Sequence, residues 1–290
     1  MSKIVDNVHS NKWDTIITSK KGLFEFNFRE IWNYKDLLLI IIKRDFTTFY
    51  KQTVLGPLWF FIQPLISTIL FSIIFNKIAK IPTNETPPYL FYMSGIIAWN
   101  YFADCLNTTS STFTNNARMF GKVYFPRIII PISKVFSGLS KFILQLLLFF
   151  IIFLYFLFNG NDQIFISFKV LIFMPFLILQ MACLGLGLGF IISSLTAKYR
   201  DLNYLIGFFT QLLMYASPII YPLSIVPEKF KYIILANPIT PIIELFRIAL
   251  LGKGDFNLNM IAFSVISTIT IFLIGLLVFN KVEKTFIDTV

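Results

Sequence analysis

The strongest constraint on this 290-residue chain is a series of apolar stretches, each about twenty residues long. A helix rises about 1.5 Å per residue, so about twenty residues cross the ~30 Å hydrocarbon core of a bilayer. These stretches predict an all-α integral membrane protein with six transmembrane helices. The predicted spans are Leu55–Phe75, Tyr89–Thr109, Phe136–Phe158, Phe168–Leu195, Leu202–Tyr221 and Leu258–Phe279.

The amino-acid composition excludes several other classes of protein. Hydrophobic residues make up 56% of the chain and charged residues 14%, whereas soluble domains carry about 25% charged residues. This balance rules out a disordered chain, a coiled coil and a nucleic-acid module. The net charge of +10 does not indicate a nucleic-acid partner, because the basic residues fall between the apolar spans and form no single stripe.

The distribution of Lys and Arg predicts the orientation in the membrane. With six spans both termini share one side, and that side carries 18 of the 25 basic residues, against seven on the other. The positive-inside rule therefore places both termini in the cytoplasm. We expect a cytoplasmic segment at 1–54, a transmembrane domain at 55–280 and a cytoplasmic tail at 281–290.

The segment Ile31–Tyr50 is apolar but interrupted by charged residues, a pattern typical of an amphipathic helix on the cytoplasmic membrane face. The alternative is a short buried helix packed on the bundle. The residues assigned to this interface helix and its end are Lys43, Arg44, Asp45, Tyr50, Lys51 and Gln52.

The segment Pro222–Gly252 follows the fifth span on the outer side. Prolines interrupt it, yet it is too apolar for an ordinary water-exposed loop. Broken helices are tolerated at membrane depth where protein shields their backbone, so we expect short re-entrant helices between spans five and six that cover the outer end of a pathway. The candidate outer-gate residues are Pro218, Pro222, Asn237, Pro238 and Arg247.

Catalytic motifs are missing from the chain. It has no GxxxxGK[ST] phosphate-binding loop, and no histidine in its spans. Gly185, Gly187 and Gly189 lie inside an apolar span, where close helix packing explains them better than nucleotide binding. Asp104 is a single carboxylate that we expect to lie near water or to be paired. We therefore predict no catalytic residue, metal site or cofactor in this chain, and a passive path that another subunit drives.

Aromatic side chains are abundant, with 35 Phe, 12 Tyr and 4 Trp. Flat aromatic faces pack against the C–H faces of sugar rings and let a polymer slide, although anchoring at the membrane interface is an equally physical use for Trp and Tyr. The candidate path residues are Trp59, Gln63, Trp99, Tyr215 and Tyr221.

Several strings, in this order along the chain, resemble the permease subunit of type-2 ABC exporters for O-antigen and related lipid-linked polysaccharides. The resemblance extends from about residue 24 to residue 281. Gln52-Thr53 replaces the basic-serine pair usual in the similar teichoic-acid permeases, which favours the O-antigen type. The strings are Arg44-Asp45, Tyr50-Lys51-Gln52-Thr53, Leu55-Gly56 with Trp59 and Gln63-Pro64, Lys122–Arg127 with Pro131, Tyr199-Arg200-Asp201, Ser217-Pro218 with Tyr221-Pro222, and Asn237-Pro238 with Arg247.

The resemblance implies a homodimer in the bacterial inner membrane, with two separate ATP-binding cassette subunits that bind ATP and Mg²⁺. It implies that spans one and five line a path for lipid-linked polysaccharide, surrounded by membrane lipids. The alternatives are export of teichoic acid, capsule, or a small lipid or drug, and, further off, an intramembrane sugar-modifying enzyme.

The loop between spans two and three is basic and contains apolar residues. By the resemblance it transmits the motion of the ATPase subunits, with its apolar residues as anchors; the alternative is a loop that only signals topology. Asn115 or Asn116 is expected to cap a brief helix that Gly121 ends. The assigned coupling residues are Asn115, Arg118, Met119, Phe120, Lys122, Tyr124, Phe125 and Arg127.

Overall fold

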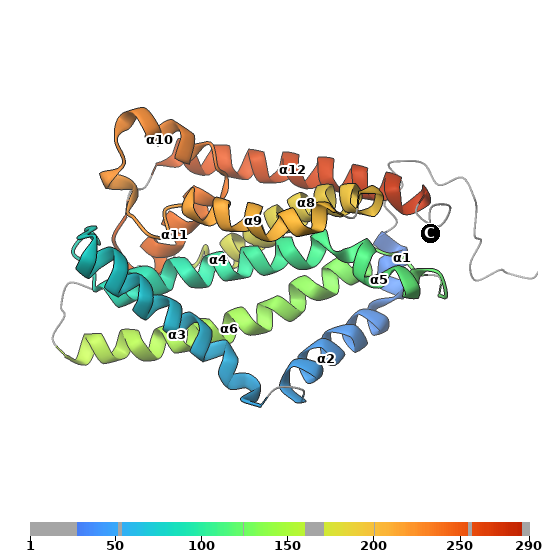
Figure 1. Cartoon of the computed structure of the whole chain (residues 1–290), viewed down its shortest axis with the longest axis horizontal. Coiled ribbons are helices and arrows are strands. Elements are labelled where there is room, and N and C mark those ends of the chain that lie inside the picture. The colour runs from blue at the N-terminus through green and yellow to red at the C-terminus, as the bar shows by residue number, and fades with distance from the viewer. Residues whose placement is uncertain are drawn as a thin grey trace, which may run out of the picture.

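The computed structural model describes residues 28–51, 54–123, 125–159, 171–199, 201–254 and 257–285. All regular structure in these ranges is helical, and the long helices lie roughly along one axis (Figure 1). In chain order they are α1 (Phe28–Asn33), α2 (Lys35–Lys51), η1 (Gly56–Leu58), α3 (Trp59–Phe71), η2 (Ser72–Ile78), α4 (Pro88–Ser110), α5 (Thr112–Phe120), α6 (Ile129–Phe158), α8 (Met174–Lys198), α9 (Leu202–Tyr215), η3 (Leu223–Ile225), α10 (Glu228–Leu235), α11 (Ile239–Leu251) and α12 (Leu258–Thr285).

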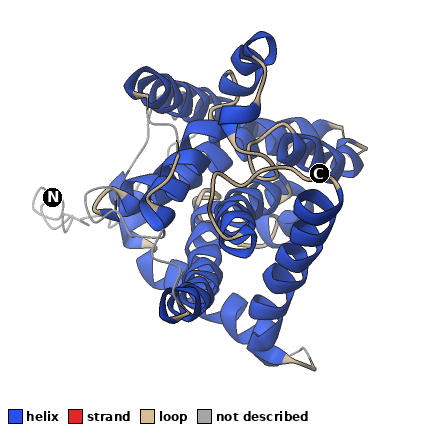
Figure 2. Cartoon of the chain, turned by 90° about the vertical axis from the view of Figure 1, so that its left-hand side faces the viewer, coloured by secondary structure: helices blue, strands red, loops and turns tan. Residues whose placement is uncertain are grey.

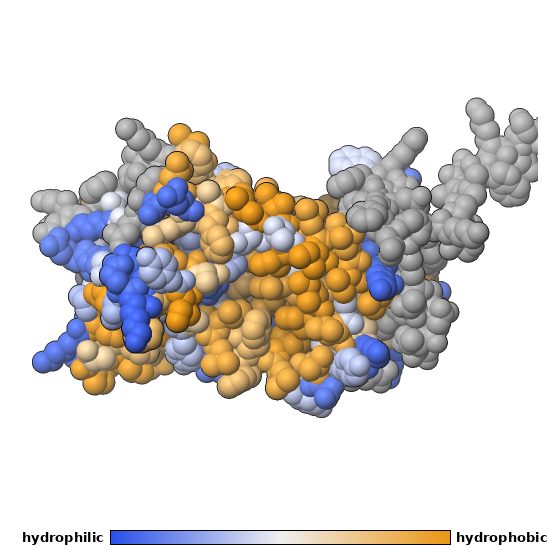
Figure 3. Space-filling view, turned by 90° about the horizontal axis from the view of Figure 1, so that it is seen from above, coloured by the Kyte–Doolittle hydropathy of each residue, from blue (hydrophilic) through white to orange (hydrophobic). Residues whose placement is uncertain are grey.

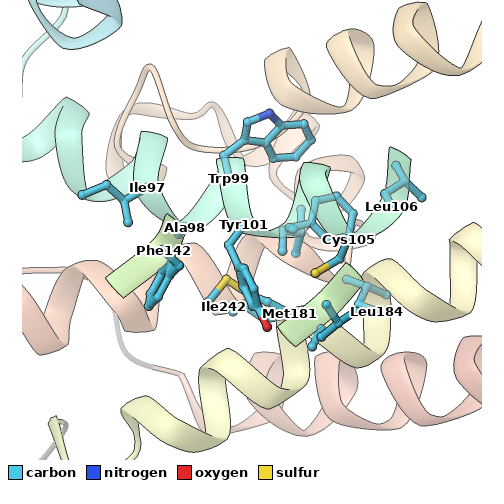
Figure 4. Close-up of a cluster of buried hydrophobic side chains, with 14 of the residues drawn as sticks. Ile97, Ala98, Trp99, Tyr101, Cys105, Leu106, Phe142, Met181, Leu184 and Ile242 are labelled. Carbon is cyan, nitrogen blue, oxygen red and sulfur yellow. The ribbon is translucent and has the colours of Figure 1, made fainter. Parts of the chain in front are cut away.

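The bundle is built around α4 and α8. Figure 2 shows the bundle nearly end-on, with its helices packed beside one another. Helix α8 packs along α4 on one side and along α12 on the other, while α6, α9 and α11 also contact α4. The core between these helices includes Tyr101 and Phe142, whose ring centroids are 5.2 Å apart, with Met181 and Ile242 beside them (Figure 4).

Three glycines explain how closely α8 approaches its neighbours. Gly185 and Gly189 lie four residues apart on one helix face, and Cβ atoms added to them would lie 2.7 and 2.5 Å from side-chain atoms of α4. Gly187 faces the other way, where an added Cβ would lie 2.8 Å from the backbone of Phe272 in α12. The interpretation of this motif as a helix-packing device is confirmed.

Four helical segments of the described chain are long and apolar enough to cross a membrane: Gly56–Ile78, Ile129–Phe158, Met174–Lys198 and Leu258–Glu283. On the face that Figure 3 shows, apolar residues form a band across the middle of the molecule, with hydrophilic residues toward both ends. A fifth candidate arises if α10 and α11, which meet at 97°, together make one span. The structure therefore supports a membrane protein with four to five candidate spans.

Helix α4 matches the predicted second span in position but is less apolar than these four. It contains Asn100, Asp104 and Asn107. Residues 90–99 are all buried, so protein rather than lipid surrounds much of this helix. Polar side chains are tolerated in a helix at the centre of a bundle because groups on neighbouring helices can form hydrogen bonds with them.

The predicted fifth span, Leu202–Tyr221, is wrong at its outer end. Helix α9 ends at Tyr215, because Pro218 has no N–H to donate and restricts the residue before it. The third span begins earlier than predicted, at Ile129 rather than Phe136. Pro131 does not prevent this, since N–H groups in a helix's first turn have no intrahelical partner.

The predicted short helices after span five are present. Helix α10 has no buried residue, whereas α11 is buried along almost its whole length. Helix α11 ends at Leu251, and the next residue, Gly252, has a φ of 70°, in the left-handed region that favours glycine just after a helix.

Candidate functional site

The first candidate residues lie on two helices, α3 and α9, each of which packs on α4 (Figure 1). Trp59 at the start of α3 is 43% exposed, and Tyr215 at the end of α9 is 48% exposed. Gln63 is also exposed and, four residues after Trp59, lies on the same helix face. Three of the five predicted path residues are therefore open to the surroundings in a single chain.

The other two predicted path residues are less available. Trp99 is 5% exposed and packs against Phe102, with ring centroids 5.3 Å apart. It projects from the side of α4 opposite Tyr101 (Figure 4). In the single chain Trp99 is therefore a buried side chain. Tyr221 is half-buried, and its hydroxyl donates to the carbonyl oxygen of Tyr215 at 3.4 Å.

The predicted outer-gate residues gather at one end of the bundle, around Arg247. Its Nη1 lies 3.2 Å from Oε1 of Glu244, and its Nη2 donates to the carbonyl oxygen of Pro218 at 2.8 Å. The guanidinium also lies 3.9 Å from the ring centroid of Phe91 in α4. Both charged side chains are almost fully buried. Arg247 therefore joins α11, the break after α9 and α4 into one packed unit.

A second group of hydrogen bonds holds the segment around Asn237 and Pro238 against the rest of the bundle. Asn237 Nδ2 donates to Ser217 Oγ at 3.1 Å, and Ser264 Oγ donates to the Pro238 carbonyl oxygen at 2.6 Å. Gln180 Nε2 in turn donates to Ser264 Oγ at 2.8 Å. These bonds connect the segment around Asn237 and Pro238 to α8 and α12. Pro222 is also buried, so all five predicted residues are buried or half-buried.

The predicted coupling segment contains a short helix, α5, but not with the predicted cap. The helix begins at Thr112 rather than after an asparagine, and Asn116 lies inside it, donating through Nδ2 to the Thr112 carbonyl oxygen at 2.9 Å. Gly121 follows the last helical residue, as expected, with an ordinary right-handed conformation.

The aromatic residues of this segment face inward. Phe120 and Phe125 are each 6% exposed, with ring centroids 5.8 Å apart. Phe113 packs against Phe120 and stacks on Phe279 of α12 at 4.8 Å. Phe120 and Phe125 therefore stabilise the chain's own core, and the surface available to a partner lies elsewhere on the segment.

We call that available surface the α5 knob. Its members are exposed residues of α5 and of the turn that follows it. Three are polar or basic and one is apolar, and Met119 is half-buried beside them. Val123 is 59% exposed, which makes it the apolar residue of the segment best placed to reach a partner. The knob consists of Asn115, Arg118, Lys122 and Val123.

Arg127 has a role that the sequence did not reveal. It is buried, its backbone N–H donates to Glu283 Oε1 at 3.1 Å, and its Nη1 donates to the Glu283 carbonyl oxygen. Its guanidinium lies over the Phe120 ring. The partner is 156 residues away in sequence, so no local motif pointed to Glu283. This contact fastens the end of α12 to the segment that carries the α5 knob.

Two ion pairs join other helices near the same end. Asp104 Oδ2 lies 3.1 Å from Lys141 Nζ, which confirms that this carboxylate is paired. Asp45 Oδ2 lies 2.6 Å from Lys134 Nζ and so fastens α2 to α6. Arg44 lies beside Asp45 and, like Lys43 and Lys51, is exposed. The remaining predicted residues of these two segments, Gln52 and Tyr124, together with the Tyr50 side chain, lie outside the described residues.

The interactions that the described residues make in this structure are packing contacts, hydrogen bonds and ion pairs. They contain no group of three or more His, Cys, Asp or Glu side chains that could hold a metal ion. Cys105 is buried, Cys183 is half-buried, and both are free thiols.

Comparison with known proteins identifies relatives over most of the chain. Residues 36–251 match the family model of the ABC-2 type transporter. An O-antigen export system permease protein RfbA of Klebsiella pneumoniae is 29% identical over 87% of this chain and 94% of that protein. The RfbA protein of Myxococcus xanthus is 25% identical over 76% of this chain and 82% of its own length. The polysialic acid transport protein KpsM of Escherichia coli is 22% identical over 85% and 93%.

Proposed function

Because this chain belongs to the ABC-2 type transporter family, we propose that it is the permease subunit of an exporter for lipid-linked polysaccharide of the O-antigen type. The observation that carries the proposal is the similarity to O-antigen export permeases over nearly their full length. The family and the names of these relatives indicate a transport permease and not an enzyme.

The proposed topology has six spans in the bacterial inner membrane. In addition to the four clear spans, α4 and α9 would cross the membrane. Protein would surround the polar residues of α4 and the ends of the short helix α9. The end of α12 lies beside α5, which supports a common side for the C-terminus and the basic α5 knob (Figure 1). The excess of Lys and Arg on that side favours the cytoplasm. Residues 1–54 would form the cytoplasmic segment, 55–280 the membrane domain and 281–290 the tail.

Helix α2 would lie at the cytoplasmic interface, with Ile41 buried against the bundle and Leu39 and Ile40 exposed toward lipid. Lys43 and Arg44 would meet anionic headgroups, each at about 1 kcal/mol. The pair between Asp45 and Lys134 supports a helix that is fastened to α6 while keeping this exposed face.

We further propose a homodimer driven by two separate ATPase subunits, which would hold ATP and Mg²⁺. The exposed faces of α3 and α9 support this arrangement, because two copies facing each other would enclose a path lined by Trp59, Gln63 and Tyr215. The α5 knob would contact the ATPase subunit. Polysaccharide attached to lipid would enter at the inner face and pass outward beneath the cover around Arg247 and Pro218.

A deletion of the gene in its native host tests the cargo. We expect surface O-polysaccharide to disappear, lipid-linked polysaccharide to accumulate inside, and both effects to be reversed by the intact gene together with its ATPase partner. The similarity to a polysialic acid transport protein makes a capsule exporter the second candidate. If the chain exports capsule, the deletion strain should lose capsular polymer instead. A teichoic-acid, lipid or drug exporter would leave both polymers on the surface.

A further inference from the structure

A cavity of about 650 Å³ lies between the end of α4, helix α5 and the first turns of α9. It is at the proposed cytoplasmic end of the bundle and is far larger than one water molecule needs. Its lining consists of Asn107, Ser111, Phe113, Thr114, Asn115, Ala117, Ala197, Asn203, Tyr204, Ile206 and Gly207.

The lining has a specific chemical character. Six of the described lining residues carry amide, hydroxyl or phenol groups, and none of the described lining residues carries a charge at neutral pH. A phosphate or pyrophosphate group is bound in proteins by Arg or Lys side chains, and the described part of the lining includes neither. An acyl chain would require an apolar lining. Neutral ligands with many hydroxyl groups match these donors and acceptors best.

Hydrogen bonds inside the protein leave suitable groups for such a ligand. Asn107 Oδ1 accepts from Thr210 Oγ1 at 2.9 Å, which leaves the Asn107 amide N–H groups to donate. The hydroxyls of Ser111 and Thr114 donate to backbone carbonyl oxygens of their own segment, so their oxygen atoms can accept. Tyr204 is 88% exposed and offers an aromatic face. Donors, acceptors and a stacking surface therefore meet in one cavity.

We propose that this cavity binds a neutral glycosyl unit of the exported polymer at its cytoplasmic entrance. The proposal rests on the proposed function and adds a binding site to it. A bound sugar touches both α5, which carries the α5 knob, and α9, which carries the path residue Tyr215. Occupation of the cavity thus reports the presence of cargo to the helix that contacts the ATPase subunit.

The test compares two double variants of the complete transporter, purified with its ATPase subunits in nanodiscs. Thr114→Val with Tyr204→Ala removes an acceptor and the stacking ring. The matched control is Thr270→Val with Tyr232→Ala: the Thr270 hydroxyl also donates to a backbone carbonyl of its own helix, and Tyr232 is an exposed tyrosine at the other end of the molecule. The probe is a neutral oligosaccharide released from the host's own surface polysaccharide, titrated by saturation-transfer NMR.

We expect the cavity variant to bind the oligosaccharide about tenfold more weakly than the wild type, and the control to bind within about twofold of it. Inorganic pyrophosphate, which imitates the carrier headgroup, should not compete. Equal binding by the cavity variant overturns the proposal, as does competition by pyrophosphate. A wild-type transporter that exports polysaccharide in cells but does not bind the oligosaccharide overturns this site alone. A wild type that exports no polysaccharide contradicts the proposed function itself.

Discussion

Arg247 donates a hydrogen bond of 2.8 Å to the carbonyl oxygen of Pro218, although the two residues are 29 positions apart and on opposite sides of the outer turn. Pro218 prevents α9 from continuing as a helix. The Pro218 carbonyl oxygen therefore has no partner within a helix, and the buried guanidinium of Arg247 donates a hydrogen bond to it. Gly95 in α4 leaves room for the arrangement, since a Cβ there would lie 3.2 Å from Arg247 Nη2. This end of the bundle is therefore held by the Arg247 side chain, which contacts three segments.

Arg247→Met should destabilise the protein strongly. It leaves the buried Glu244 carboxylate without this cation and removes the bond to Pro218, a loss of about 3–5 kcal/mol in the free energy of unfolding. The measurement is thermal unfolding in detergent. Lys253→Gln is the control, because Lys253 pairs with the exposed Glu85 and should cost at most about 1 kcal/mol. Equal melting temperatures for the two variants would show that the buried pair does not hold the outer end together.

The glycines of α8 give a second stability prediction. Gly185→Ala would place a Cβ 2.7 Å from that of Cys105, so α4 and α8 must separate, at a cost of about 1–3 kcal/mol. Gly207→Ala in α9 is the matched control, because nothing lies within 4 Å of its added Cβ. Its higher helix propensity should leave stability unchanged or raise it by up to about 1 kcal/mol. Melting curves that rank the two variants the other way would contradict the packing.

The positions of most helices could be predicted because length and apolarity act locally. The pairing of Asp104 and the packing role of Gly185 also followed from local rules, since an isolated charge or an apolar-span glycine has few alternatives in a membrane. The outer end of α9 was overestimated because an apolar run continues past Pro218, and apolarity alone does not report a broken backbone.

The burial of Phe120 and Phe125 could not be predicted, because it depends on partners far away in the sequence. An aromatic residue in a basic loop has the same local pattern whether it faces water or a core. Here the cluster is completed by Phe279, which stacks on Phe113, and by Arg127 with its distant partner Glu283. The exposed residue Val123, which sequence reasoning passed over, stands out only once this burial is known.

The α5 knob should be required for binding the ATPase subunit. Val123→Asp changes its exposed apolar residue and keeps every basic residue, so a loop that serves only as a topology signal should be unaffected. We expect membrane insertion and melting temperature to be retained, while co-purification of the ATPase subunit falls at least about fivefold, which corresponds to the loss of one apolar anchor. Phe120→Asp, in contrast, should lower the melting temperature because it buries a charge. Full co-purification with Val123→Asp would end the docking role of this surface.

The contact between Arg127 and Glu283 should hold the end of α12 in place. Arg127→Met removes the guanidinium bond to the Glu283 carbonyl oxygen, so the last turn of α12 should open more often. Hydrogen exchange of the amides at 278–285 should accelerate by about tenfold, which is the effect of losing roughly 1.4 kcal/mol of local stability. Lys281→Met, an exposed change on the same turn, is the control. Similar exchange in both variants would mean that helix packing alone holds this end.

The last prediction concerns the proposed aromatic path. Substitution of an exposed tryptophan, Trp59, and of a buried one, Trp99, should affect different properties: export in one case and stability in the other. Trp59→Ala changes an exposed side chain on α3 and should reduce polysaccharide export per permease molecule by about threefold to tenfold, with normal assembly, because the sugar loses an aromatic contact. Trp99→Ala should instead lower stability by about 3–5 kcal/mol, since it empties a buried site. Trp32→Ala, an exposed tryptophan on α1, controls for loss of membrane anchoring.

The assay measures surface polysaccharide against permease abundance. If Trp59→Ala behaves like Trp32→Ala, with lower abundance and unchanged export per molecule, Trp59 is a membrane anchor and the aromatic path does not include it.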